Sequence, residues 1–214
     1  TFVTQDKPRG LPDAFIIGKK FINKQRVALI LGDNFFHGQG LIELLNNVSE
    51  NFDSGAHIFS YNVKNPEAYG VIEDLRNGIK IVEKPKRTKS KKAITGLYYF
   101  DDDVCKLSTK LKISKRGELE IIDLLQFYLK KKKLSITELG RGSAWLDTGT
   151  SNDILKASNY VEIIQERQNQ KIACLEEIAF KKRWINRSIL KYRIKYFGKN
   201  EYSNYLNKLL NEKI

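Results

Sequence analysis

The stretch ALILGDNFF, residues 28–36, combines a buried-strand pattern with a polar ending. Val27 to Leu31 is a continuous apolar run, which is typical of a strand buried on both faces of a parallel sheet. Gly32 follows, and then a carboxylate and an amide, Asp33 and Asn34. Ligands of open α/β sheets bind beyond the carboxyl ends of the strands, so Asp33 occupies a position suited to a ligand. A turn or helix cap is the alternative role for this aspartate.

The segments on either side extend this strand into an α/β pattern. Residues 41–52 have helical periodicity and residues 56–63 alternate like a strand, so the unit reads strand, helix, strand. Arg76-Asn77-Gly78 separates two alternating runs and indicates a hairpin. The pattern predicts a doubly wound, Rossmann-like mixed sheet in residues 1–150 and a helical region in 151–214. The remaining strands are expected at 93–100 and 134–139, and the main helices at 11–22, 101–111, 118–133, 151–167, 188–197 and 202–210.

The composition is that of a globular protein with an excess of basic residues. Hydrophobic residues make up 41% of the 214, and no apolar run approaches the ~20 residues of a membrane span. No signal-peptide pattern is present, and we expect a cytoplasmic protein. Cys105 and Cys174 lack metal-ligand spacing and are expected to be two buried thiols.

The net charge of +13 is concentrated at the carboxyl end. Residues 181–214 hold ten Lys or Arg against two Glu. Such a segment could bind nucleic acid or anionic lipid. Aromatic residues and leucines interrupt it at helical spacing, which favours a solvated helical face, and we expect neither nucleic acid nor a membrane as a partner.

The first residues are polar and loop-like, and the chain contains no methionine. An α/β domain normally opens with a buried strand. We therefore expect the first βαβ portion of a longer protein to be missing here.

Three sets of residues could carry chemistry. Asp33 and Asp147 each follow an apolar patch, and two such carboxylates could hold Mg²⁺ against nucleotide phosphates. Spacing alone does not bring them together. Gly10 could let a flat base approach the backbone, or could simply precede a helix. Glu83-Lys84 could bind sugar hydroxyls and a phosphate, or form a surface charge pair.

A series of motifs in order resembles one enzyme family. The motifs are GLPDAFIIG (10–18), LGDNFFHG (31–38), NPEAYGVIE (65–73), VEKP (82–85), AITGLYYFD (93–101), KRGELEIID (115–123), GRGSAWLDTGT (140–150) and QERQ (165–168). Together they are similar to the glucose-1-phosphate thymidylyltransferases, which are sugar-nucleotide pyrophosphorylases. The similarity runs from Gln5 to about Lys182.

The resemblance implies transfer of a thymidylyl group from dTTP to glucose 1-phosphate, for dTDP-sugar (rhamnose-type) and surface polysaccharide synthesis. It implies Mg²⁺ on Asp33 and Asp147, and a homo-oligomer, expected to be a tetramer, in which the carboxyl-terminal helices make subunit or regulatory contacts. Asp33, Asp147, Lys84 and Arg116 match catalytic positions. The residues matching nucleotide-binding positions are Gln5, Gly10, Leu11 and Asp33. Those matching sugar-phosphate positions are Asn34, Tyr69, Gly70, Glu83, Lys84, Thr95, Gly96, Tyr98, Arg116 and Trp145.

Two departures from the family pattern leave alternatives open. The family's opening glycine-rich phosphate loop is absent, so we expect these residues alone to turn over poorly, and a non-catalytic nucleotide-binding subunit is one alternative. Arg9 and Pro12 replace an acidic and a small residue beside Gly10. This change leaves uridylyl or cytidylyl transfer to another sugar 1-phosphate as a second alternative.

Overall fold

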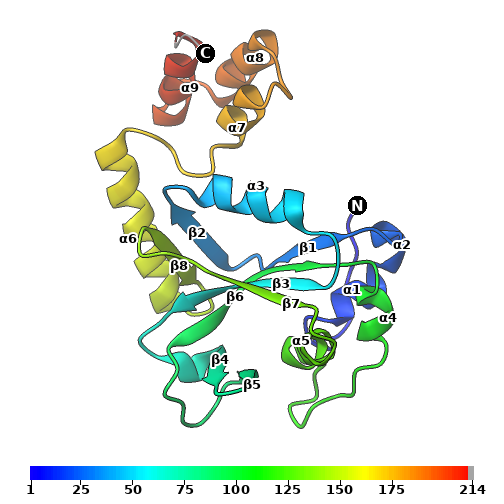
Figure 1. The fold of residues 1–214 in the computed structure, drawn as a ribbon. Helices are drawn as coiled ribbons and strands as arrows, with labels where there is room; N and C mark the ends of the chain where they lie inside the picture. The colour runs from blue at the N-terminus through cyan, green and yellow to red at the C-terminus, as the bar shows by residue number, and fades with distance from the viewer. Residues whose placement is uncertain (212–214) are drawn as a thin grey trace. The chain divides into compact units, whose positions relative to one another are not determined.

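The computed structural model describes residues 1–211, which form a mixed α/β unit followed by helices (Figure 1). Residues 212–214, the end of the expected helical region, lie outside this part. In chain order the elements are α1 (Asp13–Ile17), α2 (Lys19–Ile22), β1 (Val27–Ile30), β2 (Asn34–Gly38), α3 (Leu41–Asn51), β3 (Ala56–Asn62), η1 (Pro66–Ala68), β4 (Gly70–Leu75), β5 (Gly78–Glu83), β6 (Lys92–Phe100), α4 (Val104–Ser108), α5 (Ile121–Lys130), β7 (Leu134–Glu138), β8 (Ser143–Asp147), α6 (Ser151–Gln168), α7 (Leu175–Lys181), α8 (Arg187–Phe197) and α9 (Glu201–Asn211).

The first unit, Thr1–Asp147, is built on a six-stranded mixed sheet. The strand order is β5-β4-β6-β3-β7, and β1 also pairs with β6. Only the β3–β7 pairing is parallel among the paired strands of the described residues. Because β1 and β3 both run antiparallel to β6, they point the same way, and α3 connects them as in the expected strand-helix-strand unit. The predicted mixed α/β sheet is confirmed.

The prediction that residues 27–31 form a parallel strand buried on both faces is wrong. The strand pairs antiparallel with β6, and its residues alternate between half-buried and exposed. The side chain of Ile30 is 59% exposed. An apolar run fixes neither the direction of pairing nor burial on both faces, since it reports only residue type.

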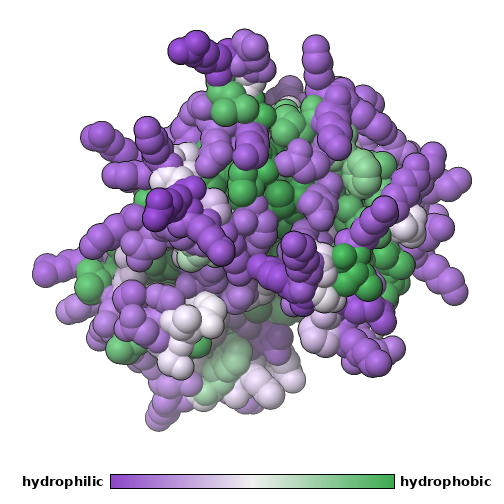
Figure 2. Space-filling view, turned by 90° about the horizontal axis from the view of Figure 1, so that it is seen from below, coloured by the Kyte–Doolittle hydropathy of each residue, from purple (hydrophilic) through white to green (hydrophobic). Residues whose placement is uncertain are grey.

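Helices cover both faces of the sheet (Figure 1). On one face, α1, α4 and α5 pack against side chains such as Ile58 and Phe100. On the other, α3 packs against Phe59 and Leu97. Successive residues of β3 and β6 thus supply opposite faces, as strand geometry requires. Polar side chains cover most of the surface seen in Figure 2, and hydrophobic residues show between them in smaller areas.

Local signals account for most element boundaries, with several differences. Helix α7, Leu175–Lys181, was not expected, and the expected helix 101–111 covers only Val104–Ser108. The expected helix 11–22 is divided at Gly18 into α1 and α2. The expected helix 118–133 begins only at Ile121, because residues 114–118 form a turn in which Gly117 has a φ of +85°. The two-stranded β2–β8 ribbon has no counterpart among the expected strands.

The second unit begins at Thr148 and is helical. Thr150 caps α6, as its spacing to Asp153 suggests, because its hydroxyl accepts the N–H of Asp153. Helices α7 to α9 enclose a small core around Leu190 and Leu206, both fully buried. Cys105 and Cys174 are free and buried, as expected. Within the described residues, no helix is long and apolar enough to cross a membrane.

Candidate active site

A pocket of about 210 Å³ opens on the first unit, where β4, β5 and β6 meet the segment before α5. Every residue that the resemblance assigns to the sugar phosphate lines it, and so do Leu11 and Asp147. Gln5, Gly10 and Asp33 do not line it. Residues from seven separate motifs are therefore brought to one cavity by the fold.

The β2–β8 ribbon places the two candidate metal-ligating residues close together along the backbone. Asn34 is the register partner of Asp147, and Asp33 directly precedes Asn34. Paired residues of antiparallel strands have Cα atoms about 4.5–5.5 Å apart, so Asp33 and Asp147 are neighbours although far apart in sequence. Two carboxylates supplying hard oxygen donors suit Mg²⁺, which commonly takes one or two carboxylates and completes its shell with water and phosphate.

The side chain of Asn34 links this pair to the pocket. Its Oδ1 accepts hydrogen bonds from Trp145 Nε1 at 2.6 Å and from the Gly96 N–H at 3.0 Å. Two donors at one end fix the orientation of the amide, and Nδ2 then donates to Asp33 Oδ1 at 3.0 Å. Asn34 therefore orients a candidate metal ligand, and Trp145, 7% exposed and packed on Tyr69, orients Asn34.

The floor of the pocket holds polar groups suited to a hydroxylated ligand. Thr95 is fully buried, and within the described residues its Oγ1 has no hydrogen-bond partner. Burial, helped by the charge of Glu83, raises the pKa of Tyr98, which keeps its phenol neutral. Burial and the neighbouring Glu120 also raise the pKa of Glu83. Gly70 leaves room here, since a Cβ on it would lie 2.8 Å from Ile122 Cδ1.

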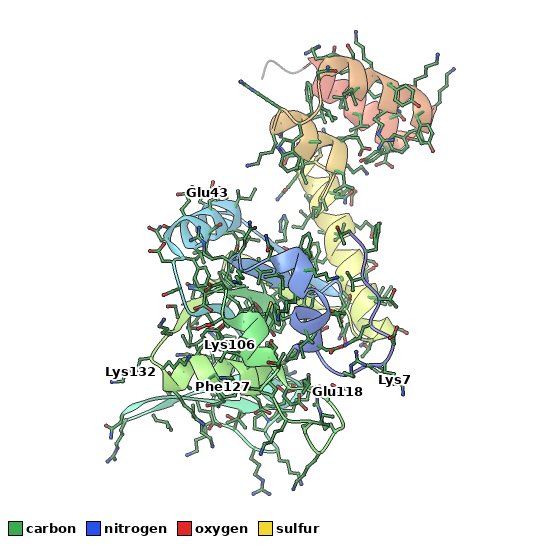
Figure 3. The ribbon with its side chains drawn as sticks, turned by 90° about the vertical axis from the view of Figure 1, so that its right-hand side faces the viewer. Lys7, Glu43, Lys106, Glu118, Phe127 and Lys132 are labelled. Carbon is green, nitrogen blue, oxygen red and sulfur yellow. The ribbon has the colours of Figure 1, made fainter. Side chains whose placement is uncertain are left out.

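A cluster of charges forms the rim. Arg116 contacts three carboxylates, those of Glu83, Glu118 and Glu120, at 3.2 to 3.6 Å. Glu118, labelled in Figure 3, lies in the turn before α5. Lys84 has a left-handed backbone, with a φ of 39°, and its N–H donates to the Tyr69 carbonyl.

The candidate base-binding residues form a separate loop. The Gln5 amide donates to the Gly10 carbonyl at 3.2 Å and to Asp13 Oδ2 at 2.9 Å. Gly10 has a φ of +95°, and a Cβ there would lie 2.1 Å from the Leu119 carbonyl oxygen, so the position needs glycine. The Leu119 N–H donates to the Arg9 carbonyl at 2.8 Å, which ties this loop to the segment that carries Arg116.

Sequence reasoning missed three acidic residues. Glu118 and Glu120 line the pocket, and their motif KRGELEIID was the available signal. Asp13 is 3% exposed and fixes both Gln5 and Arg9. Burial alone would raise the pKa of Asp13, but hydrogen bonds from Gln5 and Arg9 outweigh this effect and lower it. The i,i+4 spacing of Arg9 and Asp13 was the only sequence hint of this pair.

Solved structures of other proteins share the fold of this chain. UDP-glucose pyrophosphorylase, solved with UDP-glucose, superposes with a TM-score of 0.64 and 25% identity, over 75% of this chain and 65% of that chain. A Bacillus anthracis protein assigned as a glucose-1-phosphate thymidylyltransferase and solved with sucrose gives a TM-score of 0.64 and 34% identity, over 75% of this chain and 64% of that chain. The fold is therefore that of nucleotidyltransferases.

The sequence comparisons are more specific. A model described as nucleotidyl transferase matches residues 1–163. The glucose-1-phosphate thymidylyltransferase of Neisseria meningitidis serogroup A / serotype 4A is 45% identical over 212 residues, which cover 98% of this chain and 73% of the relative. The chain belongs to the nucleotidyl transferase family, and the resemblance to the thymidylyltransferases that its motifs indicated is confirmed.

Proposed function

We propose that this protein serves the transfer of a thymidylyl group from dTTP to glucose 1-phosphate, which yields dTDP-glucose and pyrophosphate. The observation that carries the proposal is the pocket, because every residue expected at the sugar phosphate lines it. Relatives named for this reaction at 45% identity support it. The product would feed dTDP-sugar and surface polysaccharide synthesis in the cytoplasm.

Each group has a role that its surroundings suit. The Thr95 hydroxyl, which has no hydrogen-bond partner among residues 1–211, and the Glu83 carboxylate would bind sugar hydroxyls. Lys84 and Arg116 would neutralise the phosphate and hold its attacking oxygen in position. Gln5 and the Gly10 backbone would bind the thymine base. Positioning and charge neutralisation suffice for this reaction, which needs no covalent intermediate on the protein.

Asp33 and Asp147 would hold Mg²⁺, with Asn34 fixing the direction of the Asp33 carboxylate. When bound, the ion would neutralise charge on the nucleotide phosphates. Mn²⁺ binds the same class of oxygen donors, so paramagnetic broadening by Mn²⁺ tests the pair without turnover.

The second unit would serve assembly. We include in the proposal a homotetramer in which the helices after Thr148 make subunit or regulatory contacts, as the resemblance implies. Analytical ultracentrifugation of the protein with and without residues 175–214 tests this part independently of the pocket.

Binding of glucose 1-phosphate, measured by isothermal titration calorimetry, is the decisive test of the pocket. We expect saturable binding that Thr95→Val and Lys84→Ala each weaken by about tenfold or more. The proposal would be refuted if the unaltered protein did not bind glucose 1-phosphate, or if both variants bound it as tightly as the unaltered protein. Calorimetric titration with dTTP, UTP and CTP then separates a thymidine preference from the uridine preference that the UDP-glucose pyrophosphorylase likeness raises.

A further inference from the structure

The turn that carries Arg116 is closed by its own backbone. The Ser114 N–H donates to the Glu118 carbonyl at 2.8 Å, and the Gly117 N–H donates to the Ser114 carbonyl at 3.0 Å. Gly117 takes a left-handed φ of +85°, which suits glycine. The Arg116 N–H donates to Ser114 Oγ at 3.1 Å. The backbone of Arg116 is therefore fixed at the rim of the pocket.

The carboxylate of Glu120 is held by the same turn. Its Oε1 accepts the Ser114 hydroxyl at 2.7 Å, and its Oε2 accepts Arg116 Nη2 at 3.2 Å. The side chain is only 12% exposed. Because both oxygens are engaged, Glu120 closes a ring of contacts through Ser114 and Arg116.

The three carboxylates around Arg116 do not hold it equally. The Nη2 contact with Glu120 is a hydrogen bond, whereas Nη2 lies 3.6 Å from Glu118 and Nη1 lies 3.5 Å from Glu83. N–H···O hydrogen bonds extend to about 3.2 Å between the heavy atoms, so the contact with Glu120 falls within this range and the other two are looser ion pairs. A guanidinium carries separate donors on its two ends, and one end can change partner while the other stays bound.

Glu83 is the partner more easily replaced. Burial and the nearby Glu120 raise the pKa of Glu83, so its charged form is disfavoured where it stands. A stronger anion that enters the pocket would replace Glu83 as the partner of Arg116 Nη1 with little loss of interaction energy. Glu83 would then be available to the hydroxyls of the same ligand.

We propose that Glu120 is a positioning residue for the sugar phosphate: it holds Arg116 through Nη2 and leaves Nη1 for the substrate phosphate. This inference rests on the proposed function, which supplies the phosphate. It assigns Glu120 no contact with the substrate. It predicts that loss of the Glu120 carboxylate weakens recognition of the phosphate and leaves recognition of the sugar ring unchanged.

The test compares two ligands that differ only in the phosphate, glucose 1-phosphate and glucose, by calorimetry and saturation-transfer NMR. Glu120→Gln should lower the affinity for glucose 1-phosphate about tenfold and change the affinity for glucose less than twofold. Glu120→Asp should recover part of the loss. Glu118→Gln is the matched variant, and its loss should be under threefold, because that contact is long and its side chain is 40% exposed.

The outcomes separate the inference from the proposed function. If the unaltered protein does not bind glucose 1-phosphate, the proposed function fails and this inference fails with it. If the unaltered protein binds glucose 1-phosphate and Glu120→Gln binds it equally well, only the inference is overturned. The same holds if Glu120→Gln loses affinity for glucose 1-phosphate and for glucose to the same extent. Should Glu120→Gln fold poorly, Ser114→Ala removes one anchor without changing charge, and a threefold loss specific to the phosphate ligand is expected. If Ser114→Ala binds glucose 1-phosphate as tightly as the unaltered protein, the inference is also overturned.

Discussion

Gly96 lies where the side chain of Asn34 must pass, and this predicts a sharp effect of adding one methyl group. A Cβ on Gly96 would lie 2.5 Å from Asn34 Oδ1 and 2.6 Å from its Cγ. Ordinary contact begins at 3.4 Å, so in Gly96→Ala the amide must retreat by about 1 Å. No strain is expected in the backbone of residue 96, since its φ is not in the left-handed region.

The retreat breaks the contacts that orient Asp33. Asn34 Oδ1 would lose the Trp145 and Gly96 donors, now at 2.6 and 3.0 Å, and Nδ2 would no longer meet Asp33 at 3.0 Å. Loss of a group that orients a metal ligand typically costs about 10–100-fold in metal affinity. We expect a loss of this size in Gly96→Ala, and a loss in stability of about 1–3 kcal/mol from overpacking.

Mn²⁺ affinity from water-proton relaxation measures the first effect, and urea denaturation measures the second. Gly140→Ala is the matched control, because a Cβ there would meet nothing within 4 Å. It should leave Mn²⁺ affinity unchanged. If Gly96→Ala also keeps its affinity within twofold, Asn34 does not orient the metal carboxylates and this reasoning is wrong.

Three further predictions concern single side chains. Asp33→Asn and Asp147→Asn should each abolish Mn²⁺ broadening, and a variant that keeps full affinity would exclude that residue from the metal site. Tyr128→Phe should lower the free energy of unfolding by about 1–3 kcal/mol, because Tyr128 is only 1% exposed and its hydroxyl donates to buried Asp101 at 2.9 Å. An unchanged urea midpoint would contradict this prediction. The pKa of Glu83 is raised above its ordinary 4.5, so the folded protein binds that proton more tightly and loses stability as pH rises through the raised value. The stability of Glu83→Gln relative to the unaltered protein should therefore increase from about pH 4 to pH 7, and a constant difference would count against the raised pKa.

The sequence predicted the local features well, because each depends on neighbouring residues. Asn77-Gly78 gave the β4–β5 hairpin, in which Leu75 pairs with Gly78. The Thr150 cap also depends on residues three positions apart. The start of α5 was predicted too early, since Leu119 extends the apolar pattern to the N-terminal side of Ile121 and such a pattern does not show where the helix begins.

Long-range pairing could not be predicted from residue patterns alone. The ribbon that joins Asn34 to Asp147 depends on strands whose contacting residues, such as Asn34 and Trp145, are 111 positions apart. Only the resemblance grouped these residues before the structure did. The contacts of Asp13 and Glu120 were missed because a buried, satisfied carboxylate looks like any surface acid in a sequence.

The hydrogen bond from Leu119 to the Arg9 carbonyl has a thermodynamic consequence. It joins the loop of Gln5 and Gly10 to the turn of Arg116, and a ligand that orders one of these segments therefore also restricts the other. The second ligand then has less conformational entropy to lose when it binds. Such coupling is reciprocal, so each ligand would raise the affinity for the other by the same factor.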